Sequence, residues 1–381
     1  MKILLCGGGT GGHITPILAI AHELKRQDPY CKIYYVGEHG GKFAHLIKNQ
    51  TSIDEVHTIF AGKFRRYHKE AWIIRLLDFK TNFLNARDLL YVIIGILQSF
   101  ILIKRINPDI IFLKGGYVGL PIGIAASATG KPFITHDSDA IPSLSNRLVA
   151  RWAKYNATGL PGGLYSYPKK KIKFVGIPLA TEYEGSTPGL VKTYRKEIGI
   201  DADKQLLLII GGSLGAKQLN RIVVRVMPEL LDRFPKLVVV HQVGKGNSGI
   251  YKDIIKSKRL MVFEFIPDSY RYTGAADMVI TRGGATSIAE LAVQGRAAII
   301  IPNPLLTAGH QEKNAQELGS KNLAIVLEEK DLKANPEIIL ERVSDLLKNP
   351  KKRKELSDKI KKIGSAEAAK NIAQLLLSRS N

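Results

Sequence analysis

The sequence predicts an α/β protein with two Rossmann-like domains, each built on a parallel β-sheet. Short apolar strand patterns alternate with amphipathic helix patterns along the chain, which is the order that parallel sheets require. Each half also opens with a strand that runs into a glycine-rich loop and then a helix, at residues 2–24 and again at residues 205–234. The length of 381 residues favours two domains as well.

The expected elements follow from this alternation. In the first half, strands are expected at residues 2–6, 32–36, 56–60, 110–113, 131–136 and 172–175. In the second half, strands are expected at residues 205–210, 237–241, 260–265, 278–281 and 297–301. Lysine-rich amphipathic helices are expected over residues 331–378.

Proline and glycine place the domain boundaries. Residues 1–178 form the expected N-terminal domain, and residues 179–203 form the linker. Residues 204–360 form the expected C-terminal domain. Residues 361–381 form a terminal helix, for which packing back on the N-terminal domain is one arrangement.

The most apolar run covers residues 89–103 and is interrupted by Gly95, Gln98 and Ser99. Its length of about fifteen residues falls short of the roughly 20 that a bilayer-spanning helix needs. A turn at residues 107–109 and a predicted strand follow it. A helix that leads through a turn into the next strand is the usual connection in a parallel sheet. We therefore expect a buried helix that packs on the sheet rather than a membrane span.

Composition narrows the class of partner. The formal net charge is +22, with 45% hydrophobic and 24% charged residues. This charge favours an anionic substrate or membrane over nucleic acid, because no nucleic-acid-binding motif is present. The two cysteines, Cys6 and Cys31, indicate neither a disulfide framework nor a zinc site. The first residues have a strand pattern, so no signal peptide is expected.

A basic and bulky segment at residues 61–79 is the candidate membrane contact. Arg65 and Arg66 lie near Trp72 and Ile73 in the sequence, and this combination suits an anionic lipid surface. A solvated charged loop beside a core helix is the alternative interpretation.

The first glycine-rich loop is the strongest site signal. Residues 7–12 can bring backbone N–H groups against an anion, and His13 stands where the helix begins. A second glycine-rich junction at residues 114–119 follows a strand of the same predicted sheet. Because the carboxyl ends of parallel strands meet at one edge of the sheet, both junctions are expected to line one cleft.

The strand at residues 131–136 ends in a polar run. His136, Asp137, Ser138 and Asp139 stand at its carboxyl end, where side chains are placed for a site. The Asp-x-Asp spacing leaves a divalent cation open as an alternative, although hard cations need several well-placed oxygens.

The second half repeats the pattern. Residues 211–216 form its glycine loop, and residues 282–287 bring amides and hydroxyls to another helix start, which suits phosphate groups. Glu290 lies one turn further on, where a carboxylate could accept hydrogen bonds from ribose hydroxyls. A first-turn glutamate favoured by the helix dipole is the alternative. His310, Gln311 and Asn314 share part of a helix face.

Taken together, seven segments resemble the MurG family of glycosyltransferases, and they occur in the family's order: GGGTGGHITP, KGGY, HDSD, GGSLGA, EFIPD, TRGGATSIAEL and HQEKNA. The resemblance covers nearly the whole chain. It implies the GT-B fold, in which two Rossmann-like domains face each other across a cleft. The first domain would bind the acceptor, and the second would bind UDP-N-acetylglucosamine (UDP-GlcNAc).

The resemblance also implies the reaction. N-acetylglucosamine would pass with inversion from UDP-GlcNAc to the 4-hydroxyl of the N-acetylmuramyl sugar of undecaprenyl-diphospho-MurNAc-pentapeptide (lipid I), giving lipid II. The expected place is the cytoplasmic face of the cell membrane, as a peripheral protein. UDP-GlcNAc is a substrate, so no cofactor and no metal are expected. A GT-B transferase with another lipid or small-molecule acceptor is the main alternative, and a UDP-sugar 2-epimerase and an inactive scaffold are others.

The resemblance assigns roles to individual residues. His13 would be the base that takes the proton of the acceptor hydroxyl, with Asp137 as the alternative base. Tyr117, His136 and Asp139 would lie on the acceptor side. Glycine-loop amides would stabilise the leaving UDP. The residues expected to contact UDP-GlcNAc are Thr10, Gly11, Gly12, Ser213, Phe265, Ile266, Ala285, Thr286, Ser287, Glu290, Gln311 and Asn314.

Overall fold

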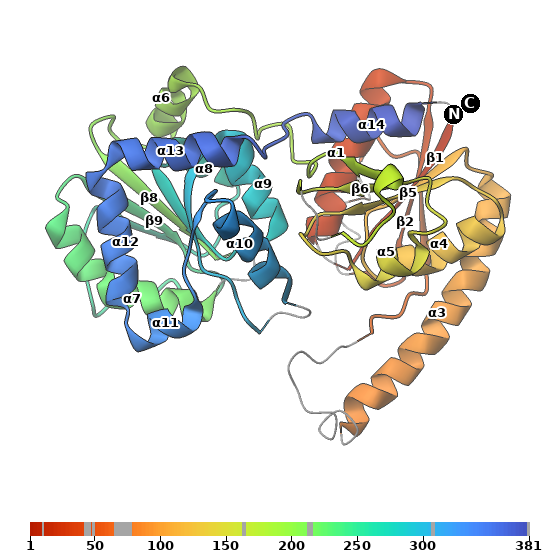
Figure 1. The fold of residues 1–381 in the computed structure, drawn as a ribbon, viewed down its shortest axis with the longest axis horizontal. Helices are drawn as coiled ribbons and strands as arrows, with labels where there is room; N and C mark the ends of the chain where they lie inside the picture. Colours follow the sequence, from red (N-terminus) through yellow and green to blue (C-terminus); the bar gives the residue numbers. More distant parts are fainter. Residues whose placement is uncertain are drawn as a thin grey trace. The chain divides into compact units, whose positions relative to one another are not determined.

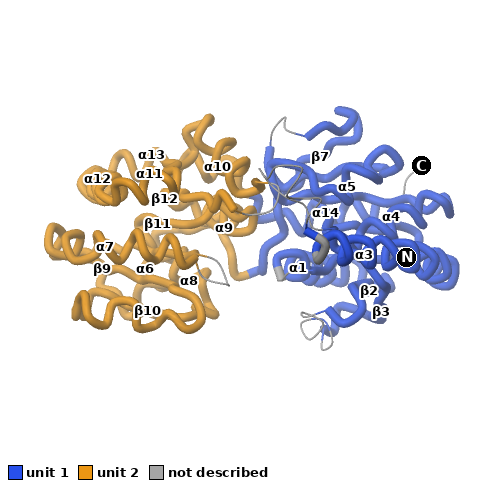
Figure 2. The backbone as a smooth tube through the Cα atoms, turned by 90° about the horizontal axis from the view of Figure 1, so that it is seen from below, with its two compact units in different colours: residues 1–181, 365–381 blue, residues 182–364 orange. Residues whose placement is uncertain are grey.

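The structure is a computed structural model that describes residues 1–9, 11–41, 47, 50–64, 78–161, 165–211, 216–305 and 309–378. The chain forms two compact units (Figures 1 and 2). Unit 1 contains residues 1–181 and 365–381, and unit 2 contains residues 182–364. Each unit has its own parallel sheet, so the expected fold class is confirmed.

Unit 1 is built on a seven-stranded sheet in which β1 and β4 are neighbours. The order of the strands along the chain reverses at this pair, and ligands of open α/β sheets bind at such a switch point. In sheet order the strands are β3 (Glu55–Ile59), β2 (Lys32–Glu38), β1 (Lys2–Cys6), β4 (Ile110–Leu113), β5 (Phe133–Asp137), β6 (Tyr155–Thr158) and β7 (Ile172–Phe174).

Helices cover both faces of this sheet, because alternate residues of its buried strands point to opposite sides. Ile3 and Leu5 of β1 face a core shared with α1 and α14, whereas Leu4 and Cys6 face α3 and α4. The α-helices of unit 1 are α1 (Gly11–Gln27), α3 (Phe79–Ile106), α4 (Gly119–Ala128), α5 (Leu144–Val149) and α14 (Ala368–Leu377), and a 3₁₀ turn, η2, covers Lys169–Lys171.

Helix α14 comes from the end of the chain and packs on α1 inside unit 1 (Figure 2). Ile372, Ala373 and Leu376 are buried in the same core as Ile17 of α1. The chain reaches α14 past Ser365, which lies close to Gly176: a Cβ added at Gly176 would lie 2.6 Å from the Cβ of Ser365.

Helix α3 differs from the sequence-based expectation. Its inner side is buried against unit 1 through Val92, Ser99 and Ile103, but its outer side is apolar and exposed, and Figure 1 shows the helix reaching beyond the rest of its unit. The expectation of a buried helix over residues 89–103 is therefore wrong for one face. The exposed apolar side chains of α3 are Phe83, Leu89, Leu90, Ile93, Ile94, Leu97 and Ile101.

Unit 2 repeats the arrangement with a six-stranded sheet, whose switch point lies between β8 and β11. In sheet order its strands are β10 (Leu260–Phe263), β9 (Leu237–Gln242), β8 (Gln205–Ile210), β11 (Met278–Thr281), β12 (Ala297–Ile300) and β13 (Ile325–Val326). Its helices are α6 (Pro188–Glu197), α7 (Lys217–Arg233), α8 (Ser269–Ala275), α9 (Ala285–Gln294), α10 (His310–Ser320), α11 (Glu329–Ala334), α12 (Glu337–Lys348) and α13 (Pro350–Lys361).

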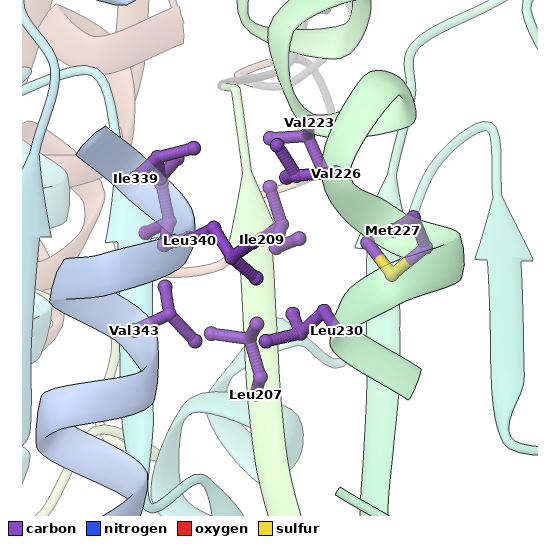
Figure 3. A pocket seen from close by; sticks show the side chains of 10 residues that line it. Leu207, Ile209, Val223, Val226, Met227, Leu230, Ile339, Leu340 and Val343 are labelled. Carbon is purple, nitrogen blue, oxygen red and sulfur yellow. The ribbon is translucent and has the colours of Figure 1, made fainter. Parts of the chain in front are cut away.

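The core of unit 2 is closely packed where α7 and α12 meet β8 (Figure 3). Leu207, Met227 and Leu340 are among ten apolar residues around a void of about 10 Å³. A void of this size and polarity holds no ligand, since even one water molecule needs about this volume and polar partners. The candidate site therefore lies elsewhere, at the carboxyl ends of the strands.

Candidate functional site

The two glycine-rich junctions of unit 1 meet at His13. The first follows β1 and the second follows β4, and these strands are hydrogen-bonded neighbours. Gly116 has a φ of +77°, and a Cβ added there would lie 3.0 Å from His13 Nδ1. Glycine is thus required at Gly116 both for its backbone conformation and for the close approach of the imidazole.

A backbone contact sets the tautomer of His13. Its Nδ1 lies 2.8 Å from the carbonyl oxygen of Gly8. A carbonyl oxygen can only accept, so in the neutral ring Nδ1 carries the proton and Nε2 carries the lone pair. A histidine held in this way is oriented to accept a proton at Nε2.

A carboxylate occupies the first glycine loop. Gly9 donates its N–H to Glu38 at the end of β2, at 3.0 Å to each oxygen. The loop closes around this group, since a Cβ added at Gly8 would lie 1.9 Å from Glu38 Oε2. The Tyr117 hydroxyl also hydrogen-bonds to Glu38, and burial together with this carboxylate raises the pKa of Tyr117 to about 12. The amide of Gly9 is thus taken by an internal anion.

Asp137 is buried and fully hydrogen-bonded, with 4% of its surface exposed. Its Oδ1 accepts from Ser143 N at 2.9 Å and from Asn146 Nδ2 at 3.0 Å, and its Oδ2 accepts from Tyr167 at 2.6 Å. Burial raises the pKa of Asp137, and these hydrogen bonds oppose the shift. These hydrogen bonds connect the end of β5 to the start of α5, so Asp137 stabilises the fold.

His136 lies beneath the site rather than on its surface. It is 0% exposed, and its Nε2 donates to the Gly176 carbonyl at 2.9 Å. Burial and the nearby Lys114 ammonium hold the pKa of His136 well below its ordinary value, so the ring is neutral. Its contacts connect β5 to the segment after β7.

Lys114 is a buried cation at the end of β4. It is 1% exposed, and its Nζ donates to Ser138 Oγ at 2.5 Å. Burial lowers the pKa of Lys114 to about 8, while Asp137 and Asp139 act in the opposite direction. Because the ammonium only donates, Ser138 accepts through its oxygen and keeps its own O–H for another partner.

Asp139 is partly exposed beside this cation, and its backbone carbonyl accepts from Tyr165 at 2.6 Å. The Asp-x-Asp alternative of a divalent cation finds little support here, since both Asp137 oxygens already accept hydrogen bonds from protein groups. Across the described part of the chain, no group of three or more His, Cys, Asp or Glu side chains could hold a metal ion.

In unit 2, the loop after β11 leads into α9. Gly283 has a φ of +79°, and Ala285, Thr286 and Ser287 form the first turn of α9, so the amide groups of a helix start stand at the switch point. Arg282 does not face a ligand as a free cation. It is 6% exposed, and its Nη2 lies 2.6 Å from Glu329 Oε2.

Glu290 belongs to a short hydrogen-bonded chain. The Tyr183 hydroxyl bonds to the Glu290 carboxylate and also lies 2.8 Å from Ser269 Oγ. Since a tyrosine has one proton to donate, Ser269 donates to Tyr183 when Tyr183 donates to Glu290. Burial raises the pKa of Glu290 to about 7, and the Tyr183 hydrogen bond lowers it.

The predicted uracil contacts differ from one another in exposure. Phe265 is 58% exposed, which is unusual for a phenylalanine, whereas Ile266 is 3% exposed. The N–H of Ile266 donates to Gln242 Oε1 at 3.0 Å, so its carbonyl is the backbone group left to face a base.

The predicted sugar contacts on α10 also have roles within the fold. Asn314 is 0% exposed, and its Nδ2 donates to the Gly283 carbonyl at 3.1 Å. Gln311 accepts from the backbone N–H of Asn303 at 3.0 Å through its Oε1. Both side chains hold the loops that follow β11 and β12.

The remaining predicted residues divide into two sets. Gly11 and Gly12 begin α1, directly before His13. The others lie outside the described residues: Thr10, Arg65, Arg66, Trp72, Ile73 and Ser213.

Comparisons with known proteins agree with this arrangement. Residues 3–158 match the glycosyltransferase family 28 N-terminal domain, and residues 206–375 match the family 28 C-terminal domain. A protein of Natranaerobius thermophilus named UDP-N-acetylglucosamine–N-acetylmuramyl-(pentapeptide) pyrophosphoryl-undecaprenol N-acetylglucosamine transferase is 33% identical over 386 residues, which are 99% of this chain and 100% of that protein.

The chain belongs to glycosyltransferase family 28.

Other similar proteins extend the comparison. The Bacillus subtilis protein of the same name is 30% identical over 382 residues, 99% of each chain. The crystal structure of MurG from Acinetobacter baumannii is similar with a TM-score of 0.75 and 25% identity, and the match covers 99% of both chains. The resemblance to the MurG family is therefore confirmed.

Three residues of the candidate sites in the two units are missing from the sequence-based prediction: Glu38 and Lys114 in unit 1, and Tyr183 in unit 2. Lys114 stands in the glycine-rich KGGY segment, so the motif itself was the available signal. Glu38 and Tyr183 carry no local signal, because each acts on a group 29 or more residues away in the sequence.

Proposed function

We propose that this protein transfers N-acetylglucosamine from UDP-GlcNAc to the 4-hydroxyl of the N-acetylmuramyl sugar of lipid I, forming lipid II. The names of its relatives, matched over 99% of the chain, support this activity. Within the structure, the observation that carries the proposal is the position of His13 between the glycine junctions of β1 and β4, with Nε2 as its basic nitrogen.

His13 is the proposed general base. The acceptor hydroxyl attacks C1 of the sugar, a new C–O bond forms, and the bond from C1 to the UDP oxygen breaks with its electron pair. The proton of the hydroxyl passes to His13 Nε2. Asp137 is the poorer candidate, because both of its oxygens are occupied and it is buried.

Unit 2 is the proposed donor-binding unit. The amides at the start of α9 would stabilise the negative charge that develops on UDP. Phe265 would cover the uracil, with the Ile266 carbonyl at the base edge, and Glu290 would accept hydrogen bonds from the ribose. Ala285, Thr286 and Ser287 would face the diphosphate and sugar, with Gln311, Asn314 and, beyond the described residues, Ser213.

In unit 1, Gly11 and Gly12 at the start of α1 are proposed to face the diphosphates. Tyr117 and Asp139 are proposed to lie on the acceptor side, and His136, which donates to the Gly176 carbonyl, is proposed to support it from below. UDP-GlcNAc acts as a substrate, and a resident cofactor is not part of the proposal.

A peripheral association with the anionic inner leaflet of the cell membrane completes the proposal. Within the described residues, α3 is long and apolar enough to cross a membrane over Thr81–Ile106, and only 28% of its most apolar window is buried. Both ends of α3 nevertheless connect strands of one sheet, and Ile103 and Ile106 lie in its core. Such a helix is suited to lie in the lipid interface with its outer face rather than to span the bilayer.

The test of the proposed function is UDP release from UDP-GlcNAc with and without a lipid I analogue in detergent. We expect acceptor-dependent release and a disaccharide-lipid product by mass spectrometry. His13→Ala should bind UDP as the wild type does and lose 10²–10⁴-fold in transfer, the usual contribution of a general base. Full activity of this variant would remove His13 as the base. Release without any acceptor requirement would contradict the transferase itself.

A further inference from the structure

A second pocket lies in unit 2, away from the glycine loops. It has a volume of about 220 Å³ and forms where the start of α6 meets the end of α9 and α13. Arg296 stands between α9 and β12, so this pocket adjoins the amino end of β12. The loop after β11, which the proposed donor site uses, lies at the opposite, carboxyl end of the strands. The pocket is therefore not part of the site described above.

Three buried polar atoms of this pocket lack a hydrogen-bond partner among the described residues: Ser186 Oγ, Gln294 Oε1 and Arg296 Nε. Gln294 is 1% exposed, and its Nε2 donates to the Tyr270 carbonyl at 2.8 Å. This contact identifies the other amide atom as the oxygen, an acceptor. A buried polar atom without a partner is costly, so three at one pocket indicate that something polar occupies it.

The charge of the pocket is positive. Arg296 bonds through Nη1 to the Ala276 carbonyl at 3.0 Å, and in the described chain neither Arg296 nor Lys361 has an ion pair with a carboxylate. The one carboxylate of the lining, Asp358, already pairs with Lys354 at 2.7 Å.

Arg296 keeps its charge at neutral pH although it is buried, and the start of a helix adds a partial positive charge. Burial lowers the pKa of Arg296 to about 10, with Asp277 acting against the shift and Arg195 adding to it. The Asp277 carboxylate already forms an ion pair with Arg195, with 2.7 Å between Oδ2 and Nη2. It therefore does not fully neutralise the charge of Arg296. Thr187, in the lining, is the N-cap of the ten-residue helix α6, whose N-terminus carries a partial positive charge.

We propose that this pocket binds hydrogen phosphate, free or as the singly protonated form of a phosphate monoester. Its oxygens would accept from Arg296 Nε, Ser186 and Lys361, and its own P–OH would donate to Gln294 Oε1. An oxyanion without a proton, such as sulfate, satisfies the donors but leaves Gln294 Oε1 without a partner. The pocket is larger than one phosphate group, which leaves room for water or for the remainder of a small monoester.

The experiment is isothermal titration calorimetry of inorganic phosphate into the whole protein at constant ionic strength. The protein is first saturated with UDP, so that phosphate cannot report on the donor site. We expect one phosphate per chain and at least a tenfold preference over sulfate, since one unsatisfied buried acceptor costs about 1.4 kcal/mol or more. Glycerol phosphate in place of phosphate, titrated at about pH 6 where much of the monoester keeps its P–OH, distinguishes a monoester site from a site for the free ion.

Variants test the assigned residues. Lys361→Gln and Ser186→Ala should each weaken phosphate binding about tenfold. Lys351→Gln is the matched control, because Lys351 is exposed on the same helix outside the pocket lining, and it should bind as the wild type does. Unchanged thermal melting and UDP affinity show that each variant is folded. Absence of phosphate binding to the UDP-saturated protein, equal binding of sulfate, or wild-type binding by both pocket variants would overturn the proposal.

Discussion

Gly9 donates its backbone N–H to both carboxylate oxygens of Glu38, at 3.0 Å to each. The loop that the sequence marks as an anion site therefore already holds an anion of the protein itself. Glu38 lies at the end of β2, next to the strand that precedes the loop. A diphosphate that binds at the start of α1 is therefore repelled by the negative charge of Glu38 in the same loop.

Removing this charge should strengthen acceptor binding. Glu38→Gln keeps an oxygen for the Gly9 N–H and removes the repulsion between the carboxylate and an anionic acceptor. We expect the KM for a lipid I analogue to fall about 3- to 10-fold, which corresponds to about 1 kcal/mol, with the KM for UDP-GlcNAc unchanged. Steady-state kinetics measure both values. Glu55→Gln removes a carboxylate from the exposed end of β3 and serves as the control. A higher acceptor KM in Glu38→Gln would mean that the charge supports binding instead.

Lys114 should lower the stability of the folded protein and strengthen binding of the acceptor. Its pKa is lowered to about 8 in the folded protein, so folding disfavours its charged form. This penalty is complete below pH 8 and disappears as the pH rises towards the ordinary lysine value. Lys114→Met should therefore melt at a higher temperature than the wild type at pH 7, with the difference shrinking above pH 8.

The same variant should bind the acceptor more weakly, because Ser138 loses the ammonium that orients its hydroxyl. We expect about a tenfold higher KM for the lipid I analogue. Lys131→Met, in the connection between α4 and β5, is the control. A lower melting temperature for Lys114→Met at pH 7 together with an unchanged acceptor KM would contradict both parts of this account.

Binding of UDP-GlcNAc should depend on pH through Glu290. The pKa of Glu290 is raised to about 7, and the ionised form accepts stronger hydrogen bonds from ribose hydroxyls than the protonated form, in which one oxygen carries a proton. Affinity should therefore rise as the pH increases from 6 to 8. UDP-GlcNAc is the suitable ligand, because its diphosphate diester does not titrate in this range. Calorimetry at several pH values measures the affinity for UDP-GlcNAc and gives the pH at the midpoint of its change.

Two variants connect this midpoint to its cause. Glu290→Gln should abolish the pH dependence. Tyr183→Phe removes the hydrogen bond that lowers the pKa of Glu290, so the midpoint should move to higher pH. Tyr194→Phe alters the same aromatic cluster through Tyr270 and should leave the midpoint unchanged. An unchanged midpoint in Tyr183→Phe would show that Tyr183 does not act on Glu290.

The outer face of α3 should carry lipid binding. Leu97 and Ile101 are 62% and 66% exposed, and transferring each to lipid is favourable by about 1.5–3 kcal/mol. Leu97→Glu and Ile101→Glu should each reduce binding to phosphatidylglycerol vesicles at least tenfold. Ile254→Glu changes an exposed isoleucine of unit 2 and should have no effect.

Added salt separates the two candidate membrane contacts. Binding that weakens strongly with salt depends on basic residues such as Arg65 and Arg66, whereas binding that survives salt depends on the apolar face of α3. Wild-type vesicle binding by both glutamate variants would exclude α3 as the contact.

Local patterns predicted much of the fold. The strands β1, β8 and β11 begin and end at the predicted residues, because each is an apolar run that stops at a glycine, threonine or polar boundary. Strand β6 has no such signal: Tyr155–Thr158 is short and polar, and the sheet rather than its own sequence makes it a strand. The glycine junctions were predictable for the same local reason.

Long-range partners account for what the sequence did not reveal. Hydropathy identifies α3 as apolar but does not say whether protein or another medium covers it. Glu38 is 29 residues from Gly9, and Lys114 is 24 residues from Ser138, so only the folded sheet brings these pairs together. Asp137 has the residue type of a base, and only its buried partners reveal its structural role.

The return of α14 to unit 1 has a consequence for synthesis on the ribosome. Unit 2 is continuous in sequence, so it has all its residues once residue 364 has been made. Unit 1 starts first but lacks Ile372, Ala373 and Leu376 of its core until the last stretch emerges. The nascent first sheet therefore waits with one side of α1 uncovered while about half of the chain is translated. The part that begins folding first is the part that finishes last.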